Sequence, residues 1–426
     1  MSEYVLFKQL IDPDVRELNH YIKLGGYEGL KKALEMDPTA VVEEVKKSNL
    51  RGRGGAGFPC GLKWSFMPKD DRQKYFLCNA DEGEPGTFKD RYIMSENPHQ
   101  LIEGMAIGGF AMGASVGYIY IRGEFKFIAD QLQKAVDEAY AAGYLGENIM
   151  GSGFNFELYL HLGAGAYICG EETGMIQSLE GHTGQPRLKP PFPAQVGVFG
   201  KPTTVNNVET IACVPDIIRK GANWFLTIGP ERNNGTKIYG VSGHVNNPGV
   251  FELPMGTPLR EIIFEHAGGI LDGKKVKAII PGGSSAPVLG PEHLDIAMDF
   301  DSLKAVGSML GSGAIIVMHE DTCIVEAFAR LADFYAHESC GQCTPCREGT
   351  PWMAQIIRNI ENGNGREGDI ELLYDICEKI IGRTICPLGD AAVFCVKGAL
   401  DRFRDEFEYH IRHKKCLVEN KVAIYG

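Results

Sequence analysis

The run His337–Gly349, with the sequence H-E-S-C-G-Q-C-T-P-C-R-E-G, places Cys340, Cys343 and Cys346 three residues apart. Far downstream, Cys386 stands directly before a proline. Three thiolates at this spacing and a remote fourth match the C-x2-C-x2-C and C-P pattern that ligates iron–sulfur clusters. Four thiolates also suit tetrahedral zinc, but zinc sites usually pair their ligands two and two, whereas this set is three plus one. The run therefore favours an iron–sulfur cluster over zinc.

The fourth ligand is expected to be Cys386 rather than another downstream cysteine. Cys377 and Cys395 lie in apolar-periodic segments that predict helices, so both are interpreted as core residues. Pro387 disfavours a helical backbone at Cys386 and predicts a loop there. A loop can turn a thiolate toward a cluster more easily than a packed helix can, and this favours Cys386.

Length, charge and cysteine content exclude several classes of protein. A chain of 426 residues predicts about three domains. The 43 Lys and Arg against 55 Asp and Glu give a net charge of −12, which argues against nucleic acid as the main partner. The sequence contains no run of 18 or more apolar residues, so it predicts no membrane-spanning helix. The N-terminus lacks the pattern of a secretory signal.

The twelve cysteines of this chain fit a reducing compartment, with thiols either free or bound to metal. Those outside the cluster motif are scattered and mostly flanked by apolar residues. Nearly all of them are interpreted as small core residues: Cys60, Cys78, Cys169, Cys213, Cys323, Cys377, Cys395 and Cys416.

Residues 1–235 predict a Rossmann-like α/β domain with a peripheral lead-in over residues 1–36. Strands and helices alternate from residue 75 to residue 179, which implies a parallel sheet covered by helices on both faces. Ligands bind such sheets beyond the carboxyl ends of the strands. Glycine-rich stretches are expected as loops at that edge; they lie at 52–61, 81–86, 104–117, 163–184 and 282–290.

The pattern changes near residue 236. A hairpin, a helix at Leu259–His266 and two further strands predict a β-grasp domain over residues 236–322. Residues 323–426 are almost entirely helical in pattern and predict a bundle that carries the cysteine motif. The predicted fold is therefore an α/β domain, followed by a β-grasp domain and a helical bundle.

Four further motifs carry polar or glycine-rich residues, at 52–61, 79–87, 163–174 and 203–210. The first, G-R-G-G-A-G-F-P-C-G, resembles a phosphate-cradling loop but follows a helix rather than a strand. The acidic second motif is either a solvated turn or a set of hydrogen-bond acceptors for a ligand. Glu171 and Glu172 in the third could be N-terminal helix residues favoured by the dipole, and an Asn of the fourth could be a helix cap.

Together these motifs closely resemble the flavin-containing, NADH-oxidising subunit of respiratory complex I, over roughly residues 35–410. The matching stretches are G-R-G-G-A-G-F-P, N-A-D-E-G-E-P-G-T-F-K-D-R, G-A-G-A-Y-I-C-G-E-E-T, P-T-T-V-N-N-V-E-T and E-S-C-G-Q-C-T-P-C-R-E-G. In that family FMN lies in the nucleotide fold, NADH stacks on the isoalloxazine ring, and the helical bundle carries a 4Fe-4S cluster. The resemblance implies an NADH dehydrogenase with FMN and a 4Fe-4S cluster as cofactors.

The resemblance also implies roles for individual residues. FMN would be held by Gly54, Lys63, Asn79, Asp81, Asn206 and Asn207, with Tyr167, Gly170 and Glu171 lining the flavin. Phe58, Phe66 and Phe192 would flank the adenine end of NADH, with Lys189 nearby. Glu84 and Glu172 would meet the NADH ribose or carboxamide and are the expected catalytic positions. Gly52, Arg53, Gly55, Gly57, Glu82 and Val205 complete the cofactor-binding set, and Cys340, Cys343, Cys346 and Cys386 would bind the cluster.

The expected reaction is hydride transfer from NADH to the flavin, followed by two one-electron steps to the cluster. The implied partners are a small 2Fe-2S subunit and a larger iron–sulfur subunit, in a cytoplasmic complex peripheral to the inner membrane. Diaphorase subunits of NAD-linked hydrogenases and formate dehydrogenases look similar, but many carry an extra head or tail that this chain lacks, which favours complex I. A non-catalytic iron–sulfur scaffold and a zinc-stabilised assembly module are the rival classes, and both predict a protein without flavin.

Overall fold

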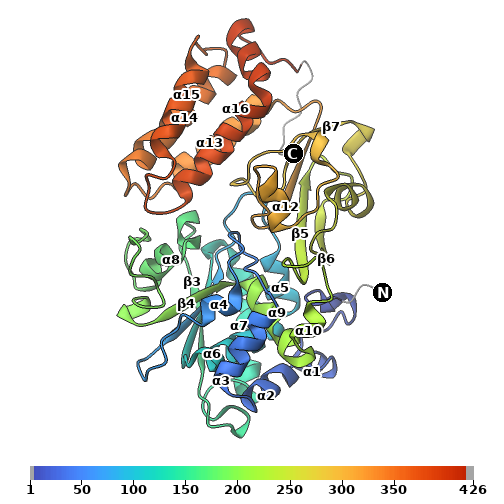
Figure 1. Ribbon diagram of the computed structural model, residues 1–426, viewed down its shortest axis with the longest axis vertical. Coiled ribbons are helices and arrows are strands. Elements are labelled where there is room, and N and C mark those ends of the chain that lie inside the picture. The colour runs from blue at the N-terminus through green and yellow to red at the C-terminus, as the bar shows by residue number, and fades with distance from the viewer. Residues whose placement is uncertain (1–3, 419–426) are drawn as a thin grey trace. The chain divides into compact units, whose positions relative to one another are not determined.

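The computed structural model describes residues 4–418, which fall into two compact units (Figure 1). The first comprises residues 1–83, 88–238 and 252–256, and the second comprises residues 84–87, 239–251 and 257–426. Within the described residues, no helix is long and apolar enough to cross a membrane. The predicted domain boundaries at 235/236 and 322/323 stay predictions.

A four-stranded parallel sheet organises the first unit, which confirms the predicted α/β class. Its strands are β1 (Tyr75–Ala80), β2 (Val116–Ile121), β3 (Glu157–Leu162) and β4 (Thr203–Asn207), in the order β3-β2-β1-β4. Strand β4 contains the first five residues of the motif at 203–210. Thr203, Thr204 and Val205 are β-branched and buried, so they suit a strand packed inside the unit.

Helices surround this sheet and supply the core around it. Their bounds are α3 (Pro38–Lys47), α4 (Cys60–Trp64), α5 (Asp90–Glu96), α6 (Pro98–Met112), α7 (Lys126–Ala141), α8 (Glu172–Leu179), α9 (Val208–Lys220) and α10 (Ala222–Phe225). The glycine content of 104–117 predicts a loop, whereas the apolar pattern predicts a helix from about His99 to Gly113; the structure confirms the helix, which is α6. A Cβ at Gly104 would lie 2.4 Å from the Ile211 carbonyl oxygen, and one at Gly108 would lie 2.5 Å from the Phe76 ring. These glycines therefore allow α6 to pack closely on α9 and β1.

Residues 4–36 are part of the core rather than a peripheral lead-in. Helix α1 (Leu18–Lys23) and helix α2 (Glu28–Leu34) pack against α6, and α2 also packs against α9. The buried carboxylate of Glu103 accepts hydrogen bonds from the Tyr27 and Leu30 amides at 2.9 Å each, and from the Tyr21 hydroxyl. These bonds hold the segment in place because they satisfy a buried charge.

The second unit contains a mixed sheet with the strand order β6-β5-β8-β7. Its strands are β5 (Thr236–Gly243), β6 (Gly249–Pro254), β7 (Val276–Ile280) and β8 (Ala314–His319), with β5 and β8 parallel and β7 and β8 antiparallel. Parallel pairing of the first and last strands fits the predicted β-grasp fold. The helix expected at Leu259–His266 is one turn, α11 (Leu259–Glu261), followed by a π-helical turn at Ile262–His266. Helix α12 (Phe300–Ala305) precedes β8.

The C-terminal part of this unit is the predicted helical bundle (orange to red in Figure 1). It consists of α13 (Ile324–Glu338), α14 (Thr344–Glu361), α15 (Asp369–Ile380) and α16 (Leu388–His413), which pack on one another. Cys377 and Cys395 are buried within α15 and α16, whereas Cys386 lies in the loop between these helices. The interpretation of Cys377 and Cys395 as core residues and of Cys386 as a loop residue is confirmed.

Candidate functional site

The order of the first sheet creates a topological switch point between β1 and β4. From β1 the chain crosses to β2 on one side, while β4 lies on the other side, with Asn79 in register with Asn207. In open α/β sheets, ligands bind beyond the carboxyl ends of the strands at such a switch point. The loop after β1 and the end of β4 therefore meet where a nucleotide is expected, and both carry predicted site residues.

The glycine-rich loop at 52–58 borders the end of β4. Its base is closed by a hydrogen bond of 2.8 Å from the Gly52 amide to the Phe58 carbonyl. A Cβ at Gly54 would lie 2.9 Å from the Asn207 Cβ, whereas a Cβ at Gly55 would meet no atom within 4 Å. The loop thus touches β4 at Gly54 and leaves open space at Gly55, as a cradle for a bound group requires.

Asn207 is the N-cap of α9 and is held on both sides of its amide. Its Oδ1 accepts hydrogen bonds from the Glu209 amide at 3.1 Å and from Lys89 Nζ at 3.2 Å. Its Nδ2 donates to Asp90 Oδ2 at 2.7 Å. Buried Lys89 forms ion pairs with Asp90 at 2.6 Å and with Glu209 at 2.9 Å. The expectation of an Asn cap is confirmed, and the buried network fixes the wall of the cradle.

Sequence reasoning missed the residues behind this wall. Lys89 and Asp90 stand in T-F-K-D-R, which ends the matching stretch N-A-D-E-G-E-P-G-T-F-K-D-R, and Glu209 stands in the fourth motif. Buried charges are rare unless they are paired, so their burial marks them as parts of one network. The available signal was their position inside two of the motifs that carry the resemblance.

Two further asparagines join the loops to one another. Asn79 donates from Nδ2 to the Gly170 carbonyl at 2.8 Å and accepts from the Asp81 amide at 3.1 Å. Asn206 accepts from Trp64 Nε1 at 2.9 Å, which ties β4 to α4. The predicted residues of the β1, β3 and β4 motifs are therefore brought together in the first unit.

A network of alternating charges, formed by Lys63, Glu172, Lys189 and Glu171, borders the third motif. Lys63 pairs with Glu172 at 2.9 Å, and Lys189 pairs with Glu172 and Glu171 at 2.8 Å each. Glu171 is the N-cap of α8 and accepts from the Thr173 amide at 2.7 Å, as the capping interpretation predicts. Although burial acts to raise the pKa of Glu172, Lys63 and Lys189 hold it below its usual value. Glu172 thus remains ionised, with two cations beside it.

Three aromatic rings of the predicted set are exposed. Phe58 is 46% exposed, Phe66 54% and Phe192 53%, and the Phe58 and Phe66 ring centroids lie 6.1 Å apart. Neighbouring exposed rings such as Phe58 and Phe66 are typical of a site that stacks a flat ligand. Tyr167 is half-buried beside Gly83, whose Cβ would lie 3.3 Å from the Tyr167 ring.

Three residues of the predicted set point inward. Arg53 is fully buried and donates to the Asn234 carbonyl at 2.7 Å. Glu82 accepts from the Asp90 amide at 2.6 Å and from Arg91 Nε at 2.9 Å, and burial raises the pKa of its carboxyl. Val205 lies inside β4 and is also buried. These side chains support the loops from behind; a contact between them and a ligand stays a prediction.

Glu84 belongs to the second unit. Its carboxylate accepts a hydrogen bond of 2.7 Å from the Ser285 amide and one of 3.2 Å from the Ser284 hydroxyl. Gly283 has a φ of +89°, and a Cβ there would lie 2.6 Å from the Glu84 Cγ. The glycine-rich stretch at 282–290 therefore holds Glu84, and the predicted contact of Glu84 with NADH stays a prediction.

The cysteine motif lies at the start of α14. Cys343 is the N-cap of this helix, and the Ile385 amide donates to its Sγ at 3.3 Å, which brings the Cys386 loop to the motif. Burial raises the pKa of the Cys346 thiol, and nearby Cys340 and Cys343 raise it further. The partial positive charge of the helix N-terminus favours thiolates there. Four sulfur donors, three from the motif around the start of α14 and one from the loop before α16, fit the donor set of a 4Fe-4S cluster.

Comparison with known proteins finds family models that match three regions of the chain. The chain matches a Nuo51 FMN-binding domain over residues 45–216, an SLBB domain over residues 238–289 and an NADH-ubiquinone oxidoreductase-F iron-sulfur binding region over residues 326–410. Together these models cover the switch point, the part of the mixed sheet from β5 to β7 and the cysteine bundle.

Full-length relatives are also similar. The chain is 55% identical over 418 residues to the NADH-quinone oxidoreductase F-subunit 2 of Rhizobium meliloti (strain 1021), covering 98% of this chain and 99% of that protein. It is 52% identical over 415 residues to the mitochondrial NADH-ubiquinone oxidoreductase 51 kDa subunit of Neurospora crassa, covering 96% and 84%. Among solved structures, a chain of an NAD+-reducing [NiFe]-hydrogenase in the air-oxidized state matches with a TM-score of 0.84 and 34% identity, covering 96% of this chain and 67% of that one.

Proposed function

The chain belongs to the family of the NADH-quinone oxidoreductase F-subunit, which is the 51 kDa subunit of complex I, and we propose how its own residues serve that activity. It is an NADH dehydrogenase subunit with FMN and a 4Fe-4S cluster as cofactors. Bound FMN supplies a group that accepts two electrons as a hydride and releases them one at a time, which no side chain does.

The FMN site that we propose is the cradle at the β1/β4 switch point. Gly54 and Gly55 leave room for the group, and Asn79, Asn206 and Asn207 present amides fixed by their protein partners. A wall held by the buried network of Lys89, Asp90 and Glu209 does not need to rearrange when the cofactor binds. Preorganisation of this kind lowers the entropic cost of binding.

The nicotinamide nucleotide is proposed to bind beside the network of alternating charges. Phe58, Phe66 and Phe192 offer faces on which an adenine can stack. Ionised Glu172 can accept hydrogen bonds from ribose hydroxyls or from the carboxamide, while Lys63 and Lys189 keep it ionised and in place. The side chains orient the substrate, and no side-chain acid or nucleophile is required.

Cys340, Cys343, Cys346 and Cys386 are proposed as the ligands of the 4Fe-4S cluster. The contact of 3.3 Å between the Ile385 amide and Cys343 Sγ supports Cys386 as the remote fourth ligand, because it joins the two parts of the motif. An amide that donates to a ligand sulfur also stabilises its negative charge.

The observation that carries this proposal is the open cradle at Gly55, next to fixed amides at the switch point. The test is anaerobic titration of the purified chain with NADH, followed by visible absorption and EPR, after flavin and iron have been measured. We expect bound FMN, about four irons per chain, and bleaching of the flavin bands by NADH. A chain that holds iron but binds no FMN would support the scaffold hypothesis instead, and a colourless zinc protein would support the assembly module.

The protein is a subunit of a respiratory complex, and we propose a small 2Fe-2S subunit and a larger iron–sulfur subunit as its neighbours, at the cytoplasmic side of the inner membrane. A diaphorase role beside a hydrogenase is the second candidate, favoured by the 34% identity to the hydrogenase chain. Purification of the native complex separates the two. Quinone reduction by NADH supports the first, and hydrogen-dependent reduction of NAD+ supports the second.

A further inference from the structure

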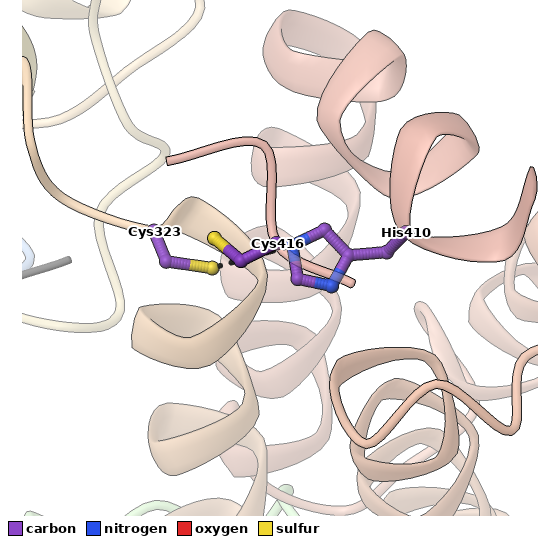
Figure 2. A group of neighbouring side chains, drawn as sticks. All are labelled: Cys323, His410 and Cys416. Atoms are coloured by element: carbon purple, nitrogen blue, oxygen red, sulfur yellow. Dashed lines mark hydrogen bonds between the residues drawn. The ribbon is translucent and has the colours of Figure 1, made fainter. Parts of the chain in front are cut away.

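A second group of metal-binding side chains lies in the helical bundle, outside the four-cysteine motif. Cys323 is the N-cap of α13, His410 lies near the end of α16, and Cys416 follows that helix. Their ligand atoms all lie within 4.8 Å of one another, and Figure 2 shows the two thiol side chains converging with the imidazole ring. Cys323 and His410 are almost fully buried. Residues 87 positions apart in sequence therefore place two sulfurs and a nitrogen at one point.

The spacing of one pair of these atoms matches the coordination shell of zinc. Zinc binds Cys sulfur at about 2.3 Å and His nitrogen at about 2.0–2.1 Å, so two such ligands at tetrahedral angles lie about 3.5–3.6 Å apart. The distance between Cys323 Sγ and His410 Nε2 is 3.5 Å. The pair can therefore share a zinc ion without movement of the helices that carry it.

Charge in the surroundings also suits a divalent cation. The nearby carboxylate of Glu406 is balanced by Lys277 at 2.6 Å and accepts from the Ile324 amide at 3.3 Å. Two thiolates and a neutral imidazole carry two negative charges, which a divalent cation cancels. A neutral group is the form that a buried site tolerates best.

We propose that Cys323, His410 and Cys416 bind a structural zinc ion, with water or a further side chain as the fourth ligand. The ion joins the start of α13 to the chain that follows α16. Zinc has no redox chemistry, so the site stabilises the bundle without drawing electrons from the cluster. None of the three ligands is part of the four-cysteine motif.

The test measures metals in the full-length chain, purified with its cluster from zinc-supplemented cells. We expect about one zinc per chain in addition to the cluster iron. Zinc-edge X-ray absorption should show two sulfurs at about 2.3 Å and nitrogen at about 2.0–2.1 Å. A shell of four sulfurs would place zinc in the four-cysteine site and would overturn the proposal. This measurement uses the wild-type chain and does not depend on whether a variant folds.

Two substitutions sharpen the test. Cys416→Ser should lose most of the zinc while keeping the iron content and the cluster EPR signal. Cys377→Ser is the matched control, because Cys377 is a buried cysteine of the same bundle whose Sγ faces Met353 Sδ at 3.6 Å, and it should keep the zinc. Equal zinc in Cys416→Ser and wild type would overturn the proposal.

A disulfide between Cys323 and Cys416 is the rival state of the same pair. Intact mass of the denatured wild-type chain, with and without reductant and after thiol alkylation, decides between them. Two alkylatable thiols at these positions, together with bound zinc, support the metal site. A zinc-free wild-type chain overturns the proposal, whether these thiols are oxidised or reduced.

Discussion

Gly54→Ala and Gly55→Ala are neighbouring substitutions that should fail in different ways. A Cβ at Gly54 would lie 2.9 Å from Asn207 Cβ and 3.3 Å from Asn207 Cγ, so the cap of α9 must shift. Overpacking of this kind costs about 1–3 kcal/mol, and partial loss of the cap adds about 0.5–2 kcal/mol. Gly54→Ala should therefore lower the free energy of unfolding of the flavin-free chain by at least about 1 kcal/mol.

A Cβ at Gly55 would meet no protein atom within 4 Å, so Gly55→Ala should leave that free energy unchanged or raise it slightly. Any gain should be no more than about 0.4–1 kcal/mol, because alanine restricts the unfolded chain. On our proposal, however, the added methyl enters the space of the bound flavin. A clash costing about 1–3 kcal/mol weakens FMN binding roughly 5- to 150-fold.

The assay uses flavin-free chains in two measurements. Urea unfolding followed by circular dichroism gives the change in stability, and quenching of FMN fluorescence on titration gives the Kd. Wild-type FMN affinity in Gly55→Ala would refute the position of the cradle. A wild-type unfolding midpoint in Gly54→Ala would show that Asn207 moves without cost, and would refute the argument from close packing.

The remaining predictions address the cluster, the second unit and the network of alternating charges. Cys386→Ala should abolish the EPR signal of the reduced cluster while Cys377→Ala keeps it, and loss of the signal in Cys377→Ala alone would overturn the ligand assignment. The same Cys386→Ala chain should keep FMN and still reduce ferricyanide with NADH, because ferricyanide can take electrons from the flavin directly. A variant that binds FMN but lacks this activity would show that the flavin cannot turn over without the cluster. Glu84→Gln should lower the ratio of kcat/KM for NADH to kcat/KM for NADPH, measured at fixed ionic strength, because an acidic residue beside the ribose disfavours the added phosphate of NADPH. An unchanged ratio would mean that Glu84 does not contact the nucleotide and serves only its hydrogen bonds with Ser284 and Ser285. Lys63→Met should lower stability by on the order of 1 kcal/mol at neutral pH. Because Lys63 and Lys189 lower the pKa of folded Glu172, that stabilisation is present above the ordinary value of 4.5 and is lost as the pH falls through the folded pKa. The difference between wild type and variant in urea midpoint should therefore shrink in acid, and a constant difference would mean that Lys63 acts through packing alone.

Local patterns in the sequence predicted much of this fold. The interval of three between Cys340, Cys343 and Cys346 indicated the cluster motif, and Pro387 indicated the loop at Cys386, since both signals act over a few residues. Alternation of apolar strands with amphipathic helices indicated the parallel sheet. Glycine content alone misread the glycines of α6 as a loop, because a glycine that admits a neighbouring helix looks like one that permits a turn until the neighbour is known.

The charged residues of the candidate site show the same limit. Glu82, Glu84 and Glu172 stand in similar glycine-rich, acidic motifs, yet they meet Arg91, the Ser285 amide and Lys63 respectively. Ser285 and Lys63 lie 201 and 109 positions away from the carboxylates that they meet. Periodicity carries no information about which distant segment arrives beside a carboxylate.

The sequence by itself determined the types and spacing of the ligands, the α/β, β-grasp and helical classes, and the family resemblance, because each depends on residues close together in the chain or on whole motifs. Only the tertiary structure decided that Asn79 and Asn207 meet at a switch point, that Arg53 faces inward, and that Cys323, His410 and Cys416 converge. Strand order and helix packing bring these residues together across more than 80 positions of sequence, and such contacts leave no local pattern from which they could be predicted.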